Sequence, residues 1–130
     1  MLFFFSIFMN FSVFALKDTT YVHDFVLLYE GANVHFDLHY QYRLEAFIEF
    51  LKKNEHVNAH VRGHVCCGPG KRLSRRRARK MYKFILAHGI AKERLSYRGY
   101  SNNAPAVSPE KEDEDEARNR RVDFELTERL

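Results

Sequence analysis

The chain has 130 residues, of which 45% are hydrophobic, and it carries a formal net charge of +4. This length suits one compact domain and excludes a large multidomain enzyme. Charged residues make up 29% of the chain and are mixed in sign, which excludes an integral membrane domain for all but the first 15 residues. With 7 Tyr and 12 Phe, the chain is not disordered throughout.

Residues 1–15 are strongly apolar and hold six of the twelve Phe and no charged residue. The run is shorter than the roughly 20 residues that a membrane-spanning helix needs. It ends with small residues, Val13 and Ala15, at the two positions that a signal peptidase recognises. We therefore predict a signal peptide over residues 1–15 and a single exported domain over residues 16–130. Because no Lys or Arg precedes the run, an uncleaved anchor and a wrongly assigned start codon are the alternatives.

The next part of the chain alternates between strand and helix patterns. Two apolar runs, residues 25–29 and 34–36, flank a turn that contains Gly, and they predict two strands. Apolar residues then recur at i, i+3, i+4 and i+7, which predicts an amphipathic helix over about residues 42–54. The residues of this stripe are Leu44, Phe47, Ile48 and Leu51. Alternation of apolar and polar residues over 56–65 predicts a half-buried strand, and residues 66–70 follow as a short loop.

A second helix is expected from about Ser74 to just before Gly89, where a glycine suits a helix stop. A strand over about 94–100 comes next, and a solvated helical turn is expected in the acidic run 110–116. Alternation over 120–126 predicts the last strand. The order strand, helix, strand, helix, strand, strand predicts an α+β fold of two layers, with both helices on one face of a mixed sheet.

Residues 71–80 carry seven positive charges and enter the second predicted helix. A helix N-terminus already bears partial positive charge, so a bound anion would offset the repulsion there. Arg77 precedes Met81 by one turn, at the edge of the apolar stripe, so it is the arginine that we expect to be held in one direction and to contact an anion. The other arginines are expected on a solvated face. Nucleic-acid binding is disfavoured by the acidic run 110–116, by the export signal and by the lack of aromatic residues among the arginines.

The two cysteines, Cys66 and Cys67, are adjacent and follow the strand that carries His60 and His64. One metal ion could not bind both histidines, since residues four apart on an extended strand are separated by roughly 13 Å. We favour two structural free thiols. A metal site of His64 with one cysteine, redox chemistry, a ring disulfide and pairing with another chain are the alternatives. No Ser/His/Asp arrangement or carboxylate pair can be assembled, so we expect no enzyme, no metal and no cofactor.

Several short motifs occur in a characteristic order: Phe36-Asp37, Val61-Arg62-Gly63-His64, Leu73-Ser74-Arg75-Arg76-Arg77-Ala78, Gly89-Ile90, Arg94-Leu95-Ser96, Gly99-Tyr100, Pro105 and Asn119-Arg120-Arg121-Val122. Over about residues 25–127 the sequence thereby resembles the OmpA-like C-terminal (peptidoglycan-binding) domain family. The resemblance implies the same two-layer fold and no catalytic activity. It also implies noncovalent binding of the diaminopimelate residue of the peptidoglycan stem peptide. Such a domain lies in the periplasm and ties the outer membrane, or an outer-membrane protein partner, to the cell wall.

The resemblance implies a ligand-binding set of five residues: Asp37, Cys66, Leu73, Arg77 and Arg120. In the family, the arginine of the LS-x-x-RA motif, here Arg77, pairs with the ligand's carboxylate, a geometry that suits a guanidinium. Asp37 and Arg120 match positions that line the family's pocket.

One position departs from the family pattern. The aspartate that ends G-H-T-D receives the ligand's ammonium group, and here Cys66 stands in its place. The loop after it is shorter than usual, and Gly70 replaces the asparagine of N-x-x-LS. A thiol is mostly neutral at pH 7, and the loss of one charge-assisted contact costs roughly 1.5–3 kcal/mol. We therefore favour weak wall binding. A different cell-wall ligand, or a structural protein of an envelope complex that has lost wall binding, are the alternatives.

Overall fold

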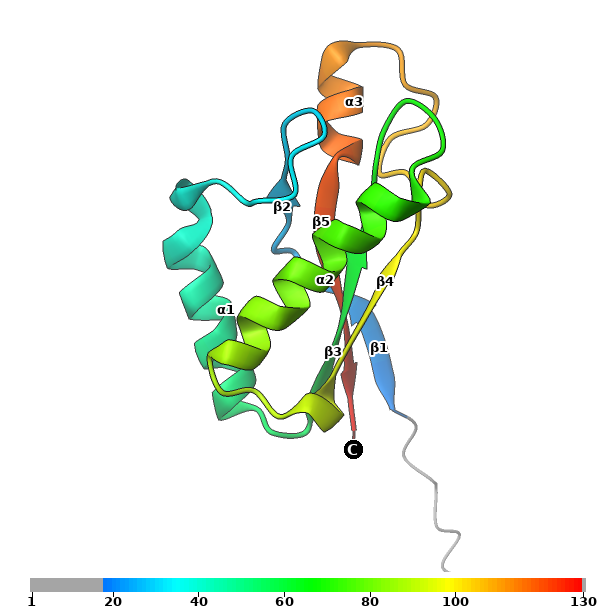
Figure 1. Ribbon diagram of the computed structural model, residues 1–130. Coiled ribbons are helices and arrows are strands. Elements are labelled where there is room, and N and C mark those ends of the chain that lie inside the picture. The colour runs from blue at the N-terminus through cyan, green and yellow to red at the C-terminus, as the bar shows by residue number, and fades with distance from the viewer. Residues whose placement is uncertain (1–17, 130) are drawn as a thin grey trace, which may run out of the picture.

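The structure is a computed structural model that describes residues 18–129, so the signal peptide predicted for residues 1–15 lies outside the described residues (Figure 1). The strands of the described part are β1 (Thr19–Val22), β2 (Leu27–Leu28), β3 (Val57–Gly63), β4 (Leu95–Gly99) and β5 (Arg121–Glu128). The α-helices are α1 (Gln41–Lys53), α2 (Lys71–Ala87) and α3 (Asp113–Asn119), and the short 3₁₀ turns are η1 (Leu38–Tyr40) and η2 (Lys92–Arg94).

The sheet is built around β5, which pairs with strands on both of its edges. β3 lies antiparallel along one edge, and β1 and β2 lie antiparallel along successive parts of the other. β4 joins the outer edge of β3 in the parallel direction, so the strand order is β1-β5-β3-β4. The mixed sheet and the α+β class predicted from the sequence are therefore confirmed.

Both long helices, α1 and α2, cover the same face of the sheet, and the hydrophobic core lies between the two layers (Figure 1). The alternation predicted for β3 is observed, with Val57 and Val61 at most 1% exposed. Phe124 of β5 lies at the centre of an aromatic cluster. Its ring centroid is 4.4 Å from that of Phe47 and 5.8 Å from that of Phe25. Burial of these large apolar surfaces is the main force that holds the helices on the sheet.

Two expectations about the elements are corrected. Residues 34–36 form no strand, because Phe36 leaves the sheet and packs its ring edge-on against Phe84 of α2, with 5.3 Å between the centroids. The edge of β5 is taken instead by β1, whose mostly exposed residues show no clear apolar alternation. α2 begins at Lys71 rather than at Ser74, because the amide of Ser74 already donates a helical hydrogen bond of 2.9 Å to the carbonyl four residues before it.

The first turn of α2 lies directly against the ends of β3 and β4. A Cβ atom at Gly63 would overlap the carbonyl oxygen of Ser74, and one at Gly99 would overlap the amide nitrogen of Arg75. Glycine at these two positions therefore lets the helix backbone approach the sheet. The buried hydroxyl of Ser74 also accepts a hydrogen bond of 3.0 Å from the amide of Ser101. The start of α2 is thus held in place beside the loop that follows β4.

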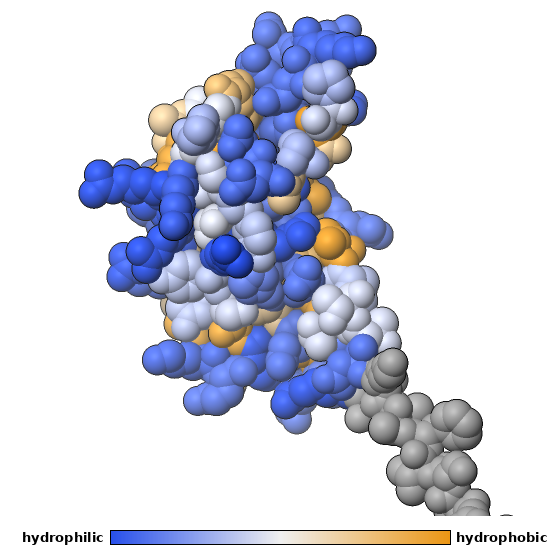
Figure 2. Space-filling view, turned by 90° about the vertical axis from the view of Figure 1, so that its right-hand side faces the viewer, coloured by the Kyte–Doolittle hydropathy of each residue, from blue (hydrophilic) through white to orange (hydrophobic). Residues whose placement is uncertain are grey.

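The helical turn expected over residues 110–116 is found in part: residues 110–112 precede the helix, and α3 runs from Asp113 to Asn119. Its N-terminus has a capping box in which Glu112 and Asp115 accept hydrogen bonds from each other's backbone amides. The side of the molecule on which β4 lies is mostly hydrophilic, with small hydrophobic patches (Figure 2). Across residues 18–129, no helix combines the length and the apolar character that crossing a membrane requires.

Candidate functional site

Arg77 lies at the centre of the predicted site, but it is fully buried, with 0% of its surface exposed. Its guanidinium donates to three main-chain carbonyl oxygens, those of Asn33 at 2.8 Å, His64 at 3.0 Å and Gly31 at 2.6 Å. The ring of Tyr29 packs against it, with 5.1 Å from Cζ to the ring centroid. Burial lowers the pKa of Arg77 below its ordinary value. Arg77 therefore fastens the loop after β2 to the end of β3, and these three donors are occupied by the protein itself.

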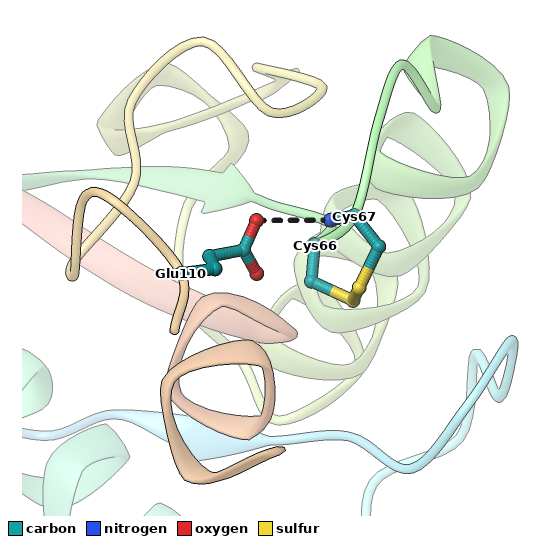
Figure 3. A group of neighbouring side chains, drawn as sticks. All are labelled: Cys66, Cys67 and Glu110. Carbon is teal, nitrogen blue, oxygen red and sulfur yellow. Dashed lines mark hydrogen bonds between the residues drawn. A yellow bond between two sulfur atoms is a disulfide. The ribbon is translucent and has the colours of Figure 1, made fainter. Parts of the chain in front are cut away.

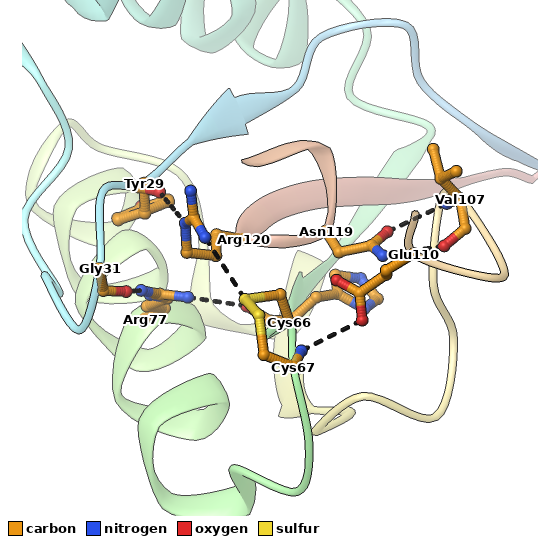
Figure 4. Close-up of a disulfide and its surroundings, with 10 residues drawn as sticks. Tyr29, Gly31, Cys66, Cys67, Arg77, Val107, Glu110, Asn119 and Arg120 are labelled. Atoms are coloured by element: carbon orange, nitrogen blue, oxygen red, sulfur yellow. Dashed lines mark hydrogen bonds between the residues drawn. A yellow bond between two sulfur atoms is a disulfide. The ribbon is translucent and has the colours of Figure 1, made fainter. Parts of the chain in front are cut away.

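Cys66 and Cys67 form a disulfide in the loop between β3 and α2 (Figure 4). The prediction of two free thiols is therefore wrong. The ring disulfide, considered as an alternative, is the arrangement found. The chain turns sharply here, with Cys67 in the left-handed region at φ 66°, and in this turn the two sulfurs meet. Cys66 is half-buried and Cys67 is exposed. Cys66, for which the sequence resemblance implies an aspartate position, thus holds an uncharged sulfur.

Arg120, between α3 and β5, connects the disulfide to the loop after β2. Its Nε donates to the carbonyl oxygen of Tyr29 at 3.1 Å, and its Nη1 donates to the Sγ of Cys66 at 3.4 Å. The guanidinium groups of Arg120 and Arg77 lie near each other between the loop and the disulfide (Figure 4), and this proximity contributes to the lowered pKa of Arg77, after the larger effect of burial. Arg120 is half-exposed, and its Nη2 has no hydrogen-bond partner within residues 18–129. Arg120 is therefore the cation of this site that a ligand can reach.

A cavity of about 350 Å³ lies between the loop after β2 and the end of α3. Arg120 lines it together with two acidic residues, Glu30 and Asp37, and much of the remaining lining is aromatic. The carboxylate of Asp37 caps η1 by accepting a hydrogen bond of 2.9 Å from the amide of His39, and this bond lowers the pKa of Asp37. The side chain of Asp37 is 67% exposed, so it stays accessible from solvent. The cavity thus presents one cation and two carboxylates to a ligand.

The structure brings four of the five predicted residues to one region. Asp37 and Arg120 line the cavity, Cys66 contacts Arg120, and Arg77 lies below the same loop. Leu73 is half-buried on the first turn of α2 and does not line this cavity. Sequence reasoning missed Glu30, because an acidic residue beside a glycine turn carries no signal of its own.

A second cavity, of about 650 Å³, follows the outer side of α2. It is lined by Tyr97 of β4 and by five basic residues: Lys71, Arg72, Arg75, Arg76 and Arg79. None of these cations forms an ion pair with another residue of the part that the structure describes. The arginines predicted to lie on a solvated face are indeed exposed, and they form a positive surface separate from the cavity that Arg120 lines.

A buried charged cluster lies on the face of the sheet opposite the helices, and the sequence reasoning did not find it. Asp123 accepts hydrogen bonds from Arg62 at 2.6 and 2.9 Å, from Arg121 at 3.1 Å and from His64 at 3.2 Å. Burial alone raises the pKa of Asp123, but the hydrogen bonds from His64 and Arg62 outweigh it and hold the pKa well below its ordinary range. Arg62 and Asp123 stand opposite each other in the register of β3 and β5. The alternation of polar and apolar residues could have shown that both side chains lie on the polar face of the sheet. The sequence does not give the register of the two strands, which places these residues opposite each other.

Within residues 18–129, one group could offer metal ligands: Cys66, Cys67 and Glu110, whose ligand atoms all lie within 4.8 Å of one another (Figure 3). Both sulfurs are part of the disulfide, so neither is the thiolate that metal ions bind. Glu110 instead accepts a hydrogen bond of 3.1 Å from the amide of Cys67. His64, the other candidate ligand, donates to Asp123. In this oxidised form the group is therefore not a metal centre.

No protein-family model matches the chain, and no curated protein sequence matches it. Solved structures are similar to it. The peptidoglycan-associated lipoprotein from Burkholderia pseudomallei superposes with a TM-score of 0.71 at 15% identity, covering 78% of this chain and 88% of that one. The C-terminal domain of Helicobacter pylori MotB has a TM-score of 0.72 at 20% identity, covering 78% and 83%. The cell wall anchor of the T6SS from Pseudomonas aeruginosa has a TM-score of 0.68 at 22% identity, covering 85% and 88%. At these identities the similarity shows a shared fold.

Proposed function

We propose that this chain, which has the OmpA-like fold, is a noncovalent peptidoglycan-binding module of the periplasm without catalytic activity. Two of the similar structures are a peptidoglycan-associated lipoprotein and a cell wall anchor, which supports a role at the wall. In this proposal the domain links an outer-membrane or envelope component to the cell wall. Its ligand is the diaminopimelate residue of the stem peptide, and an outer-membrane protein is the further partner.

The observation that carries the proposal is the mixture of charges in the cavity that Arg120 lines. The free end of diaminopimelate is a zwitterion, with one carboxylate and one ammonium group on the same carbon. The half-exposed guanidinium of Arg120 suits the carboxylate, and Glu30 or Asp37 suits the ammonium group. In this proposal Arg77 and Cys66 do not contact the ligand but support the residues that do. Arg77 holds the loop that forms one wall, and Cys66 accepts a hydrogen bond from Arg120.

Sedimentation with insoluble peptidoglycan of the diaminopimelate type tests the proposal. Wild type is expected to sediment with the wall material, and Arg120→Gln to lose tenfold or more in affinity through one charge-assisted contact. Arg75→Gln is the matched control, because it removes the same charge from the exposed surface of α2. A soluble muropeptide with free diaminopimelate should compete, whereas one whose diaminopimelate carboxylate is amidated should compete less.

Two results contradict the proposal. The first is that wild type stays in the supernatant at low and moderate salt. The second is that Arg75→Gln and Arg120→Gln weaken sedimentation equally, which would indicate nonspecific attraction to a basic surface. Arg77→Ala is a poor probe here, since it leaves three carbonyl oxygens without their donors and disturbs the fold.

A second function, a structural protein of an envelope complex without wall binding, is favoured by the chemistry around Arg77. Each nitrogen of the Arg77 guanidinium already donates to a main-chain carbonyl, and the disulfide at Cys66 carries no charge for an ammonium group. This function predicts no sedimentation with peptidoglycan, together with co-purification of one defined envelope protein. The sedimentation experiment therefore separates the two functions.

A further inference from the structure

The disulfide between Cys66 and Cys67 does not cross-link distant parts of the chain, because the two residues are adjacent. A disulfide stabilises a fold mainly by closing a loop in the unfolded chain, and this effect grows with the length of the loop. Here there is almost no loop to close. Its contribution to stability is therefore small, and its surroundings indicate a chemical role.

The two sulfurs lie in different environments. Cys66 is half-buried, and its Sγ accepts a hydrogen bond of 3.4 Å from the guanidinium of Arg120. Cys67 is exposed, and its backbone amide is held by the carboxylate of Glu110 at 3.1 Å (Figure 3). A thiolate that forms at Cys66 would thus lie beside a positive charge, whereas one at Cys67 would lie beside a negative charge. A neighbouring cation stabilises a thiolate and makes it a better leaving group in disulfide exchange.

We propose that the Cys66–Cys67 disulfide is a site of thiol–disulfide exchange, with Cys67 as the attacked sulfur and Cys66 as the leaving group. The partner is a dithiol, either a small molecule or a reduced cysteine pair of another protein. This inference does not depend on the binding of peptidoglycan.

The exchange takes two steps. The first thiolate of the partner attacks the Sγ of Cys67 and forms a mixed disulfide. The bond between Cys66 and Cys67 breaks, and its electron pair goes to the Sγ of Cys66, beside Arg120. The second thiol of the partner then attacks the mixed disulfide and releases Cys67. The partner is oxidised to its own disulfide, and two electrons and two protons are transferred to the cysteine pair.

Trapping of the first step tests the direction of attack. The purified protein is mixed with glutathione, quenched within seconds by a thiol-alkylating reagent, digested and mapped by mass spectrometry. We expect glutathione on Cys67 and the alkyl group on Cys66, with at least a tenfold excess over the opposite arrangement. Equal amounts, or glutathione chiefly on Cys66, would overturn the proposal.

Reduction rates with dithiothreitol test the role of the two charges. Arg120→Met is expected to slow reduction three- to tenfold, whereas Arg75→Met, which removes an exposed arginine of α2, leaves the rate unchanged. Glu110→Gln is expected to speed the same reduction a few-fold, because it removes a negative charge that repels the incoming thiolate. Because Glu110 is exposed, this substitution should leave the fold intact, and it therefore tests the proposal even if Arg120→Met does not fold. Unchanged rates in folded Arg120→Met, or in Glu110→Gln, would contradict the proposal.

Discussion

Arg77 donates a hydrogen bond of 2.6 Å to the carbonyl oxygen of Gly31, a residue 46 positions earlier in the chain. With its bonds to Asn33 and His64, this contact joins α2, the loop after β2 and the end of β3 at one side chain. Buried carbonyl groups cost free energy when they lose their donors. Arg77 is thus first a structural residue, and it shapes the cavity through the loop that it holds.

Arg77→Ala is expected to lower the free energy of unfolding by about 3 kcal/mol or more, through the unpaired carbonyls and the space left by the side chain. Urea denaturation followed by circular dichroism measures the effect. Arg76→Ala, next to it on the exposed side of α2, should cost less than about 0.5 kcal/mol. A loss of under 1 kcal/mol for Arg77→Ala would show that the three hydrogen bonds are not essential to the fold.

Asp123→Asn should lower the free energy of unfolding by about 3 kcal/mol or more. The substitution removes the negative charge that Arg62 and Arg121 share, and leaves two cations together in a poorly solvated region. Glu125→Gln is the matched control, because that carboxylate is 38% exposed and lies 3.9 Å from Arg62. Thermal unfolding of the two variants side by side measures the difference. Equal losses in the two would contradict the importance of the buried cluster.

Stability should fall as the pH is lowered, in two stages. Burial lowers the pKa of His64 below its ordinary value of 6.5, so below that pH the unfolded chain binds a proton that the folded protein does not. The second stage begins below about pH 4, because the pKa of Asp123 is also lowered in the folded state and its contribution is lost as it protonates.

Urea unfolding at pH 7.5, 5.5 and 3.5 checks these signs. His64→Gln should flatten the decrease between pH 7.5 and 5.5 while leaving the later one in place. His60 contributes to the first stage in the same direction, since burial lowers its pKa too. Constant stability between pH 7.5 and 5.5 in wild type would contradict the prediction.

Gly63→Ala is expected to destabilise the protein by about 2 kcal/mol or more, since its Cβ would overlap the backbone carbonyl of Ser74 and push α2 away from the sheet. Gly31→Ala is a useful comparison. That position has open space but a φ of 51°, so only backbone strain of about 1 kcal/mol is expected. Chemical denaturation of both variants shows which loses more free energy of unfolding. A larger loss for Gly31→Ala than for Gly63→Ala would argue against close packing at Gly63.

The double variant Cys66→Ser, Cys67→Ser should unfold within about 1 kcal/mol of wild type, because a disulfide between neighbours restricts the unfolded chain very little. Denaturation under non-reducing conditions measures this directly. A loss of several kcal/mol would mean that the disulfide supports the fold of the loop and of Arg120, which contacts it.

Much of the fold was predictable because its signals are local. The stripe of α1 and the alternation of β3 each follow from a period of 3.6 or 2 residues, and both are buried as expected. The loop position of residues 34–36 was not predictable, since an apolar run beside a glycine turn fits a strand as well as a loop. Its contact with Phe84, 48 positions after Phe36, decided between the two.

The sequence by itself determined the helices, most of the strands, the basic segment on α2 and the resemblance to OmpA-like domains. Only the tertiary structure decided that Arg77 serves three carbonyls, that Cys66 and Cys67 form a disulfide beside Arg120, and that Asp123 joins two arginines and a histidine. The physical reason is that helix and strand patterns reflect interactions between near neighbours in the chain. The partner of a buried charge can instead come from far away in the chain, as Arg62 and Asp123 pair across 61 positions, and the disulfide between the neighbours Cys66 and Cys67 depends on the turn that the folded loop makes.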